Sequence, residues 1–299
     1  MMLLCDILSM MEKIDLHTHT IFSDGTDSAS EIIRKAREAE LDLFSVTDHD
    51  SIRGGIEIPS LMAQLQQDQR VAFIRGVEFS CRDELGKYHI LGYGYDPDIP
   101  GIAEVVAKGH ELRMQKTNAR LAFLEEEFGF EFTAEEIEEL LARDNPGKPH
   151  IANLMIQHGY AADKKDAIAN YINKKKLQNV HVHPQEAIEG ILKSGGIPVL
   201  AHPPYGDGDQ LIVGEELEQR LLRLMDFGLK GLEAYYSGFT PKTRSEILAL
   251  AERHDLYVTA GSDYHGSNKS LIELGWTNLE DLSEAPQGLH RFLEDVEIL

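Results

Sequence analysis

The first third of the chain alternates between short apolar runs and an amphipathic segment. The apolar runs predict strands at residues 13–19, 41–47, 71–79 and 88–93. Between the first two runs, Ser28 and Glu31 form the Ser-x-x-Glu pattern of a capping box, which predicts a helix that continues to Ala39. Apolar residues recur at helical spacing along this segment. This part of the chain is therefore predicted to fold into β/α units.

The pattern changes in the middle of the chain. Residues 102–171 have the apolar spacing of helices and no clear strand. The glutamates between Glu125 and Glu139 are typical of solvated helix faces, and Thr133 with Glu136 forms a second capping-box pattern. We interpret residues 102–183 as a helical insertion domain.

The alternation returns after His183. The pattern predicts helices at 184–194, 215–227 and 240–254 and strands at 197–201, 231–236 and 256–261. Repeated β/α units favour a parallel sheet or barrel, so residues 12–101 and 184–299 are expected to form one barrel domain. Met10 and Met11 directly precede the first patterned segment, which favours an upstream start codon and a loose tail over residues 1–11.

Composition agrees with a soluble globular protein. The 299 residues are 42% hydrophobic and 27% charged, which is ample for a buried core. The net charge of −22 argues against a broad basic face for long nucleic acids, since phosphate contacts need Lys and Arg. A small phosphorylated substrate or a strand end remains compatible with this charge.

The cysteine content and the hydropathy of the chain indicate the cellular compartment in which the protein is expected. Cys5 and Cys81 are the two cysteines, and they form neither a disulfide framework nor a CxxC pair. A reducing cytoplasm is therefore the expected compartment. No apolar run approaches the roughly 20 residues that span a membrane, and the first residues lack the basic start of a signal peptide.

Two short motifs place polar side chains in pairs at strand ends. In His17-Thr18-His19, alternation along a strand puts both imidazoles on one face, where they can bind one cation. The same spacing recurs with Asp263 and His265, directly after the last predicted strand. Asp24 follows the first motif after a short turn.

Further candidates lie beside other predicted strands. His49 belongs to Thr47-Asp48-His49-Asp50 after the second strand, Glu78 ends the third, His89 starts the fourth, and His202 follows the fifth. The full set of candidate ligands is His17, His19, Asp24, His49, Glu78, His89, His202, Asp263 and His265.

Taken singly, each candidate histidine is more often a hydrogen-bonded structural residue than a ligand. Jointly, so many polar groups at the mouth of one barrel need cations to satisfy them. Imidazole and carboxylate ligation suits zinc, manganese or iron, and the lack of thiolate ligands argues against a structural zinc site.

The sequence resembles the polymerase-and-histidinol-phosphatase (PHP) superfamily of metal-dependent phosphoesterases. The resemblance runs in order through His17-Thr18-His19, Asp24, Thr47-Asp48-His49-Asp50, Gly76-Val77-Glu78, His89, Ala201-His202-Pro203 and Gly261-Ser262-Asp263-Tyr264-His265. It is similar above all to stand-alone bacterial members with a helical insertion, which act on nucleoside 3′,5′-bisphosphates and on the 5′ ends of short RNA. The resemblance implies an α/β fold, a distorted (β/α)7 barrel.

The resemblance also implies two or three divalent metal ions (Mn, Fe or Zn). In such a site His17, His19, Glu78 and Asp263 would hold the first metal; Asp24, His49 and His265 the second; and Glu78, His89 and His202 the third. A bound metal pair would supply a hydroxide nucleophile near neutral pH. Some members have a histidine where this chain has Asp24.

Other candidates lie around the ligands. Asp48 or Asp50 is expected to orient a ligand histidine, while Asp50 is equally suited to capping the next segment. Lys148 and His150 stand in Gly147-Lys148-Pro149-His150, which resembles a phosphate-contacting motif that more often carries Arg at the lysine position.

Two basic residues near the ends of barrel strands, Arg244 and Lys269, are further candidates for binding substrate. After the strand that holds Glu233, the family often has a histidine where this chain has Tyr235-Tyr236-Ser237.

These observations favour a cytoplasmic metal-dependent phosphoesterase that hydrolyses a phosphomonoester. The expected substrate is a nucleotide, such as a nucleoside 3′,5′-bisphosphate, or the 5′ end of a short oligonucleotide, with neither long nucleic acid nor membrane as a partner. The alternatives are a histidinol-phosphate phosphatase and a non-catalytic metal-binding accessory module.

Overall fold

A computed structural model describes residues 11–143, 146–177, 180–206 and 211–299. The expected loose tail lies outside the described residues except for Met11, which is buried. The chain divides into two compact units. One comprises the described residues up to Val106 together with His183–Leu299, and the other spans Ala107–Val182.

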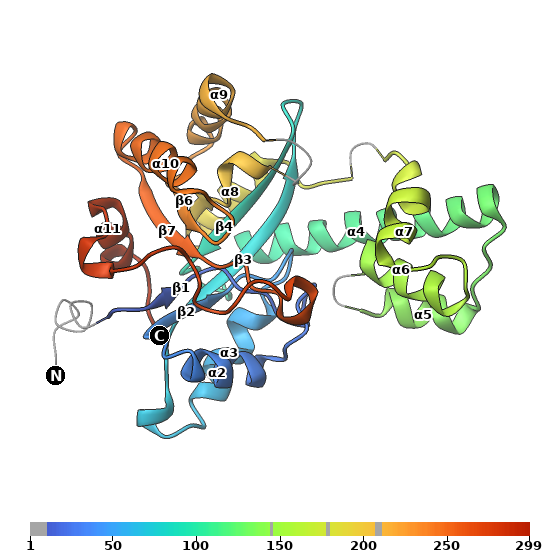
Figure 1. Cartoon of the computed structure of the whole chain (residues 1–299), viewed down its shortest axis with the longest axis horizontal. Coiled ribbons are helices and arrows are strands. Elements are labelled where there is room, and N and C mark those ends of the chain that lie inside the picture. The colour runs from blue at the N-terminus through green and yellow to red at the C-terminus, as the bar shows by residue number, and fades with distance from the viewer. Residues whose placement is uncertain (1–10, 144–145, 178–179, 207–210) are drawn as a thin grey trace. The chain divides into compact units, whose positions relative to one another are not determined.

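The first unit is built on a seven-stranded sheet whose strands follow one another in sequence order. The strands are β1 (Ile14–Asp15), β2 (Leu43–Val46), β3 (Ala72–Arg82), β4 (Lys87–Tyr93), β5 (Ile197–Leu200), β6 (Gly231–Tyr236) and β7 (Tyr257–Gly261). The chain after β1 meets the chain of β7, because Leu16 N–H donates to Ala260 O at 2.8 Å and Asp263 N–H donates to His17 O at 2.8 Å. The sheet is thereby nearly closed into a barrel (Figure 1).

Strand direction departs from the expected parallel sheet at β4. Strands β1, β2 and β3 run parallel, as do β5, β6 and β7, but β4 pairs antiparallel with both β3 and β5. The cause is the short turn after β3, in which the Asp83 carboxylate accepts from the N–H groups of Leu85 and Gly86. Strands joined by so short a turn can pair only as a hairpin.

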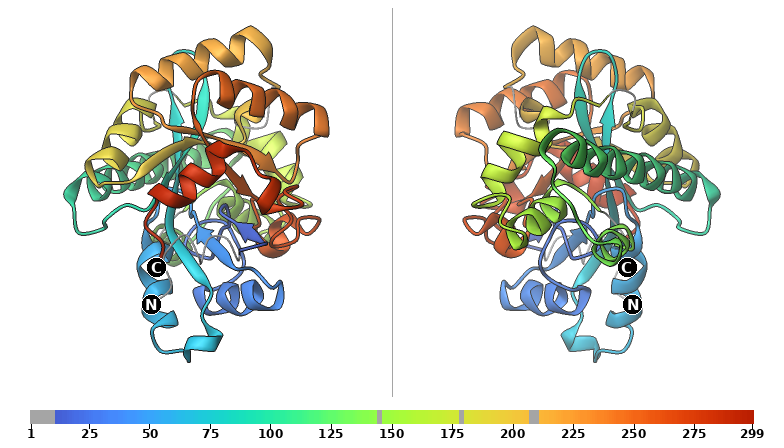
Figure 2. Two further views of the ribbon diagram at one scale, coloured as in Figure 1. Left: turned by 90° about the vertical axis from the view of Figure 1, so that its left-hand side faces the viewer. Right: turned by 90° about the vertical axis from the view of Figure 1, so that its right-hand side faces the viewer.

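Helices of the first unit lie around the sheet (Figures 1 and 2). They are α2 (Ala29–Glu38), α3 (Arg53–Met62), α8 (Pro184–Lys193), α9 (Gly214–Asp226), α10 (Pro241–Arg253) and α11 (Gln287–Asp295). Helix α2 begins with the predicted capping box of Ser28 and Glu31. Its buried Ile32 packs with Phe44 of β2 and Phe73 of β3 in one apolar cluster.

The described part of the second unit is helical and contains no strand. Its elements are α4 (Pro100–Phe128) from Ala107 onward, α5 (Ala134–Leu141), α6 (Lys148–Gln157), α7 (Lys164–Asp166), and a π turn and a 3-10 turn that end at Lys174. Helix α5 begins with the capping box of Thr133 and Glu136. A separate core forms around Leu124, Ile151 and Met155.

No helix in the described part of the chain combines the length and the apolar character needed to cross a bilayer.

Candidate metal centre

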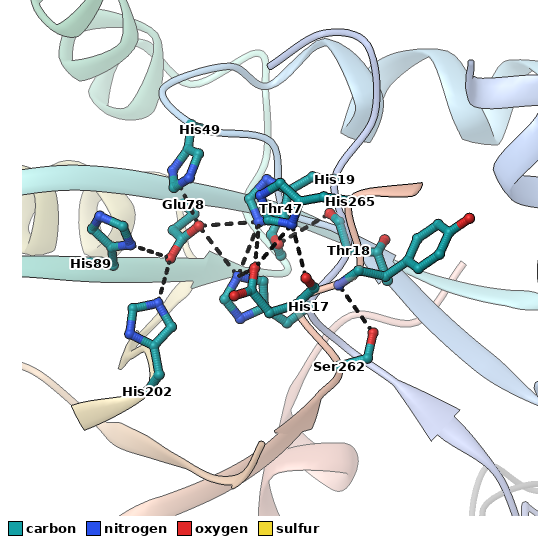
Figure 3. Close-up of polar contacts among 12 residues, drawn as sticks. His17, Thr18, His19, Thr47, His49, Glu78, His89, His202, Ser262 and His265 are labelled. Atoms are coloured by element: carbon teal, nitrogen blue, oxygen red, sulfur yellow. Dashed lines mark hydrogen bonds and ion pairs between the residues drawn. The ribbon is translucent and has the colours of Figure 1, made fainter. Parts of the chain in front are cut away.

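His17 and His19 follow β1, and their side chains face the same way. Between them, Thr18 pairs with Tyr264 in an isolated bridge and donates its hydroxyl to Ser45 O at 2.7 Å. Alternation then places the two imidazoles together, with their Nε2 atoms 3.2 Å apart (Figure 3). Strand β1 itself is shorter than expected, so the pair lies on extended chain beyond the ladder rather than within it.

Asp263 and His265 approach the same point from the end of β7. Asp263 Oδ1 is 3.6 Å from His17 Nε2 and 3.4 Å from His19 Nε2. This approach depends on Gly261, because a Cβ there would lie 2.2 Å from the Cβ of His17. The two period-two motifs are thus adjacent in space, although nearly the whole chain separates them.

Glu78 lies inside β3 and not at a strand end, which corrects the expectation from sequence. Strand β3 continues to Arg82 because it forms the hairpin with β4. Glu78 is nevertheless level with the mouth of the barrel, since its parallel partner β2 stops at Val46 and His49 forms an isolated bridge with Glu78. The long strand holds this carboxylate by ladder bonds on both sides of the residue.

Imidazoles surround the carboxylate of Glu78 (Figure 3). Its Oε2 lies 3.3 Å from His17 Nε2, and 3.2 Å from both His19 Nε2 and His49 Nδ1. Its Oε1 lies 2.8 Å from His89 Nδ1 and 3.3 Å from His202 Nε2. One carboxylate is thus the common neighbour of five histidine side chains from four segments of the chain.

Asp24 completes the other side of the cluster. Its Oδ1 lies 3.1 Å from His265 Nε2 and 3.7 Å from His19 Nδ1, and its Oδ2 lies 4.0 Å from His49 Nε2. The expected ligands are therefore brought together in one continuous cluster.

The donor set fits divalent cations. Ligand atoms that all lie within 4.8 Å of one another occur in the groups His19, Asp24, His49 and His265; His17, His19 and Asp263; and His49, Glu78 and His89. Buried imidazoles and carboxylates at this density need a cation to balance them, and His202 Nδ1 is buried without a hydrogen bond among the described residues. A further group, Asp83, Glu84 and His183, is not assigned as a site, because Arg223 forms ion pairs with both of its carboxylates.

The electrostatics of the cluster are strongly coupled. Burial would raise the pKa of Glu78, but the imidazoles of His49, His89 and His17 outweigh it and hold that pKa well below its usual value. Burial would lower the pKa of His17, but the neighbouring carboxylates, led by that of Glu233, raise it well above the ordinary value. For His49, burial prevails and lowers the pKa to about 3. For Glu78 and His17, the proximity of opposite charges thus outweighs the cost of burying them.

Glu233 of β6 was not among the residues expected at the site. Its Oε1 is 2.8 Å from His17 Nδ1, and its Oε2 accepts from the backbone N–H of His202 at 2.8 Å. The first contact directs His17 Nε2 toward the cluster, and the second fixes His202, whose φ of +28° is unusual for a residue with a side chain. A lone glutamate in the otherwise apolar run Gly231–Tyr236 was the sequence signal that could have drawn attention to it, although that signal does not indicate its partners.

Asp48 and Asp50 hold backbone near the ligands. Asp48 accepts hydrogen bonds from the backbone N–H and hydroxyl of Thr20 and from the hydroxyl of Ser23. It thereby holds the turn between His19 and Asp24. Asp50 accepts from the backbone N–H of Ser80 at 3.0 Å. The alternative capping role for Asp50 is wrong for α3, whose N-cap residue is Ile52 without a side-chain cap.

The expected substrate-binding residues occupy different places. Lys148 begins α6 in the second unit, and His150 Nδ1 accepts from the N–H of Gly147 at the start of that helix. Arg244 donates to Asn278 O at 2.7 Å. Lys269 lies against Asp263, with Nζ 2.5 Å from Oδ2, and thereby contacts the ligand cluster.

Comparison with known proteins places this geometry in a family. The model of the PHP domain matches residues 15–227. The chain belongs to the PHP domain family. The metal-ligand cluster and the nearly closed barrel agree with this membership.

Three curated proteins are similar over most of their length. A 3′,5′-nucleoside bisphosphate phosphatase of Chromobacterium violaceum is 28% identical over 95% of this chain and 97% of its own. A phosphoribosyl 1,2-cyclic phosphate 1,2-diphosphodiesterase of Eggerthella lenta is 28% identical over 88% of this chain and 97% of its own. The 5′-3′ exoribonuclease Rnm of Escherichia coli is 28% identical over 87% of each chain.

Two solved structures share the fold. An amidohydrolase of Chromobacterium violaceum with bound sulfate and no metal superimposes with a TM-score of 0.78 at 26% identity, over 96% of this chain and 97% of its own. A protein of Bifidobacterium adolescentis, predicted to be a metal-dependent phosphoesterase, gives a TM-score of 0.76 at 27% identity, over 95% of this chain and 96% of its own. This PHP protein is a metal-dependent hydrolase of phosphoester bonds, with a distorted (β/α)7 barrel and a helical insertion.

Proposed function

We propose that this chain removes a phosphate group from a nucleotide, such as a nucleoside 3′,5′-bisphosphate, or from the 5′ end of a short oligonucleotide. The observation that carries the metal-dependent chemistry is the position of Glu78, whose carboxylate lies within 3.3 Å of imidazole nitrogens from five histidines. The similarity to a nucleoside bisphosphate phosphatase and to an exoribonuclease supports a nucleotide substrate.

The centre is proposed to hold two or three divalent cations, of manganese, iron or zinc. His17, His19, Glu78 and Asp263 would hold one; Asp24, His49 and His265 another; and Glu78, His89 and His202 the third. When bound, such cations lower the pKa of a coordinated water and stabilise charge on phosphoryl oxygens.

The chain's own residues prepare this centre. Glu233 holds one nitrogen of His17 at 2.8 Å, which leaves the other nitrogen for the cluster. Asp48 fixes the turn that carries Asp24. Because these contacts exist before substrate arrives, the ligand atoms are preorganised and need little rearrangement.

The charge distribution supports a small substrate. A net charge of −22 disfavours long nucleic acids, whose binding depends on many cationic contacts. Lys148 and His150 at the start of α6 are proposed to bind substrate phosphate, since the N-terminus of a helix favours anions.

The test uses metal-free protein and defined substrates. Protein stripped by a chelator is assayed with adenosine 3′,5′-bisphosphate, a 5′-phosphorylated short oligoribonucleotide and histidinol phosphate, before and after Mn²⁺, Fe²⁺ or Zn²⁺ is added. We expect activity on a nucleotide substrate only after cation is restored. A preference for histidinol phosphate would support the histidinol-phosphate phosphatase alternative, and cation binding without turnover of any substrate would support an accessory module.

A histidine control makes this test specific. His19→Ala should abolish the restored activity, because the His19 imidazole contacts Glu78 through Nε2 and Asp24 through Nδ1. His254→Asn should not, because His254 pairs with Glu218 away from the cluster. Full activity in verified metal-free protein would overturn the proposal.

A further inference from the structure

The two oxygens of the Asp263 carboxylate face different surroundings. Oδ1 lies 3.4 Å from His19 Nε2 and 3.3 Å from His265 Nδ1, on the side of the candidate ligands. Oδ2 accepts from the Tyr236 hydroxyl at 2.9 Å and from the Lys269 ammonium at 2.5 Å. The carboxylate is almost fully buried, so these two donors satisfy Oδ2 in place of bulk water.

We propose that Tyr236 and Lys269 are positioning residues, which hold Asp263 so that it binds a cation through Oδ1 alone. This inference rests on the proposed metal centre and adds residues that lie outside the ligand set. Two donors on one oxygen, one of them cationic, draw electron density from it and leave Oδ1 as the available ligand atom.

Hydrogen bonds fix the backbone near Tyr236 and Asp263. Ser237, next to Tyr236, donates its hydroxyl to Ser262 O at 2.7 Å, which ties the end of β6 to the residue before Asp263. Asn278 donates its side-chain amide to Tyr236 O at 2.8 Å. Asp263 itself has a φ of +60°, a conformation that costs energy and persists only where surrounding contacts enforce it.

The ring of Tyr236 is also held. It packs against Phe239 at 5.1 Å and against His202 at 5.4 Å between ring centroids. Restrained rings lose little further freedom when the hydroxyl bonds Asp263, so the contact is preorganised.

The type of residue at position 236 matters for the ligand set of the centre. An imidazole can itself bind a metal ion, whereas the protonated phenol of Tyr236 can only donate to a carboxylate. Tyr236 therefore directs Asp263 without adding a ligand to the centre.

The chain supplies a matched control next to Tyr236. Tyr235 is also half-buried, but its ring lies beneath the Arg244 guanidinium, 5.7 Å from the ring centroid. Tyr235→Phe removes one hydroxyl at the adjacent position and leaves the Asp263 contacts intact.

The experiment measures cation binding and not turnover. Metal-free wild type, Tyr236→Phe, Tyr235→Phe and Lys269→Gln are titrated with Mn²⁺ by equilibrium dialysis, and their Co²⁺ forms are compared by visible absorption, which reports ligand geometry. We expect Tyr236→Phe to weaken binding at one site by roughly 10- to 100-fold and to change the cobalt spectrum. Tyr235→Phe should match the wild type in both measurements.

The partly exposed Lys269 provides a second route if Tyr236→Phe does not fold. Lys269→Gln keeps a donor but removes the charge, and it too should change the cobalt spectrum. Wild-type affinity and spectrum in both Tyr236→Phe and Lys269→Gln would overturn this inference while leaving the metal centre standing. Wild type that binds no divalent cation would instead overturn the proposed function, and this inference with it.

Discussion

At the scale of single residues, one carboxylate joins the two sides of the site. Glu78 contacts His89 and His202 through Oε1 and His17, His19 and His49 through Oε2. A carboxylate in this position can bind two cations at once and offset part of their mutual repulsion. Glu78 is therefore expected to be the least replaceable of the ligands.

Glu78→Gln should lose both bound metal and activity, because the amide keeps the size of the side chain but removes its charge. Asp48→Asn is the comparison, since Asp48 is equally buried but bonds Thr20 and Ser23 in place of the ligand cluster. It should retain more of its metal, while losing about 1–3 kcal/mol of stability through its broken hydrogen bonds. For both variants, metal content is measured by mass spectrometry, stability by thermal unfolding and activity by phosphatase rates. A wild-type metal count and rate in Glu78→Gln would show that the bridging role is wrong.

Glu233 offers a second prediction at this scale. Glu233→Gln should weaken cation binding by roughly 10- to 100-fold, because the amide cannot orient His17 as the carboxylate does. The measurement is metal retained after dialysis against a weak chelator. Glu218→Gln is the control, since Glu218 pairs with Arg253 and His254 away from the cluster. Equal retention in both variants would reduce Glu233 to a structural role.

Much of this residue-level picture was accessible from sequence, and the reasons are physical. The pair His17 and His19 could be predicted to share a face, because alternation along an extended chain needs no tertiary information. The same spacing predicted the pair Asp263 and His265, although the φ of +60° at Asp263 departs from an extended chain. The roles of Glu233 and Lys269 could not be predicted, because they depend on which neighbour a side chain reaches across the barrel. Spacing along one strand carries no record of contacts between strands.

At the scale of elements, the order of strands and helices followed from the pattern, whereas strand direction did not. The repeated β/α units favoured a parallel sheet or barrel, but the connection between β3 and β4 is so short that these strands can pair only as a hairpin. Helices α3 and α11 were not anticipated. Helix α3 contains an internal Pro59 and lacks a side-chain cap, so the usual signals of a helix start are weak there.

Close packing between elements leads to a prediction for Gly261. At the end of β7, an added Cβ would lie 2.2 Å from the Cβ of His17 and 2.5 Å from Oε1 of Glu233. Gly261→Ala must therefore push β1 and β7 apart where their ligands meet, and it should lower both stability and metal content. Circular dichroism on heating and metal analysis are the measurements.

Gly129→Ala separates these two effects. Gly129 has a φ of +67° with open space around it, so alanine there strains the backbone of the second unit without touching the ligands. It should lower stability and keep the metal. A full metal content in Gly261→Ala would contradict the account of how β1 and β7 bring the ligands together.

At the scale of the whole molecule, the chemistry and the proposed substrate selection belong to different units. The candidate ligands all lie in the barrel unit, while Lys148 and His150 lie in the helical unit of Ala107–Val182. A division of this kind lets one metal centre serve different substrates, because the residues that select them can change independently. The separate apolar cores of the two units are consistent with such independence.

The last prediction tests this division through Lys148. If its ammonium binds a phosphate that does not react, it stabilises the bound substrate and the transition state equally, so Lys148→Ala should raise KM by about 10-fold or more and change kcat little. The effect should be large for adenosine 3′,5′-bisphosphate and small for an otherwise identical monophosphate, which lacks the second phosphate. Lys164→Ala, at an exposed lysine of α7 in the same unit, should leave both constants unchanged. A collapse of kcat with unaltered KM would instead place Lys148 at the reacting phosphate, and the helical unit would then take part in the chemistry as well as in selection.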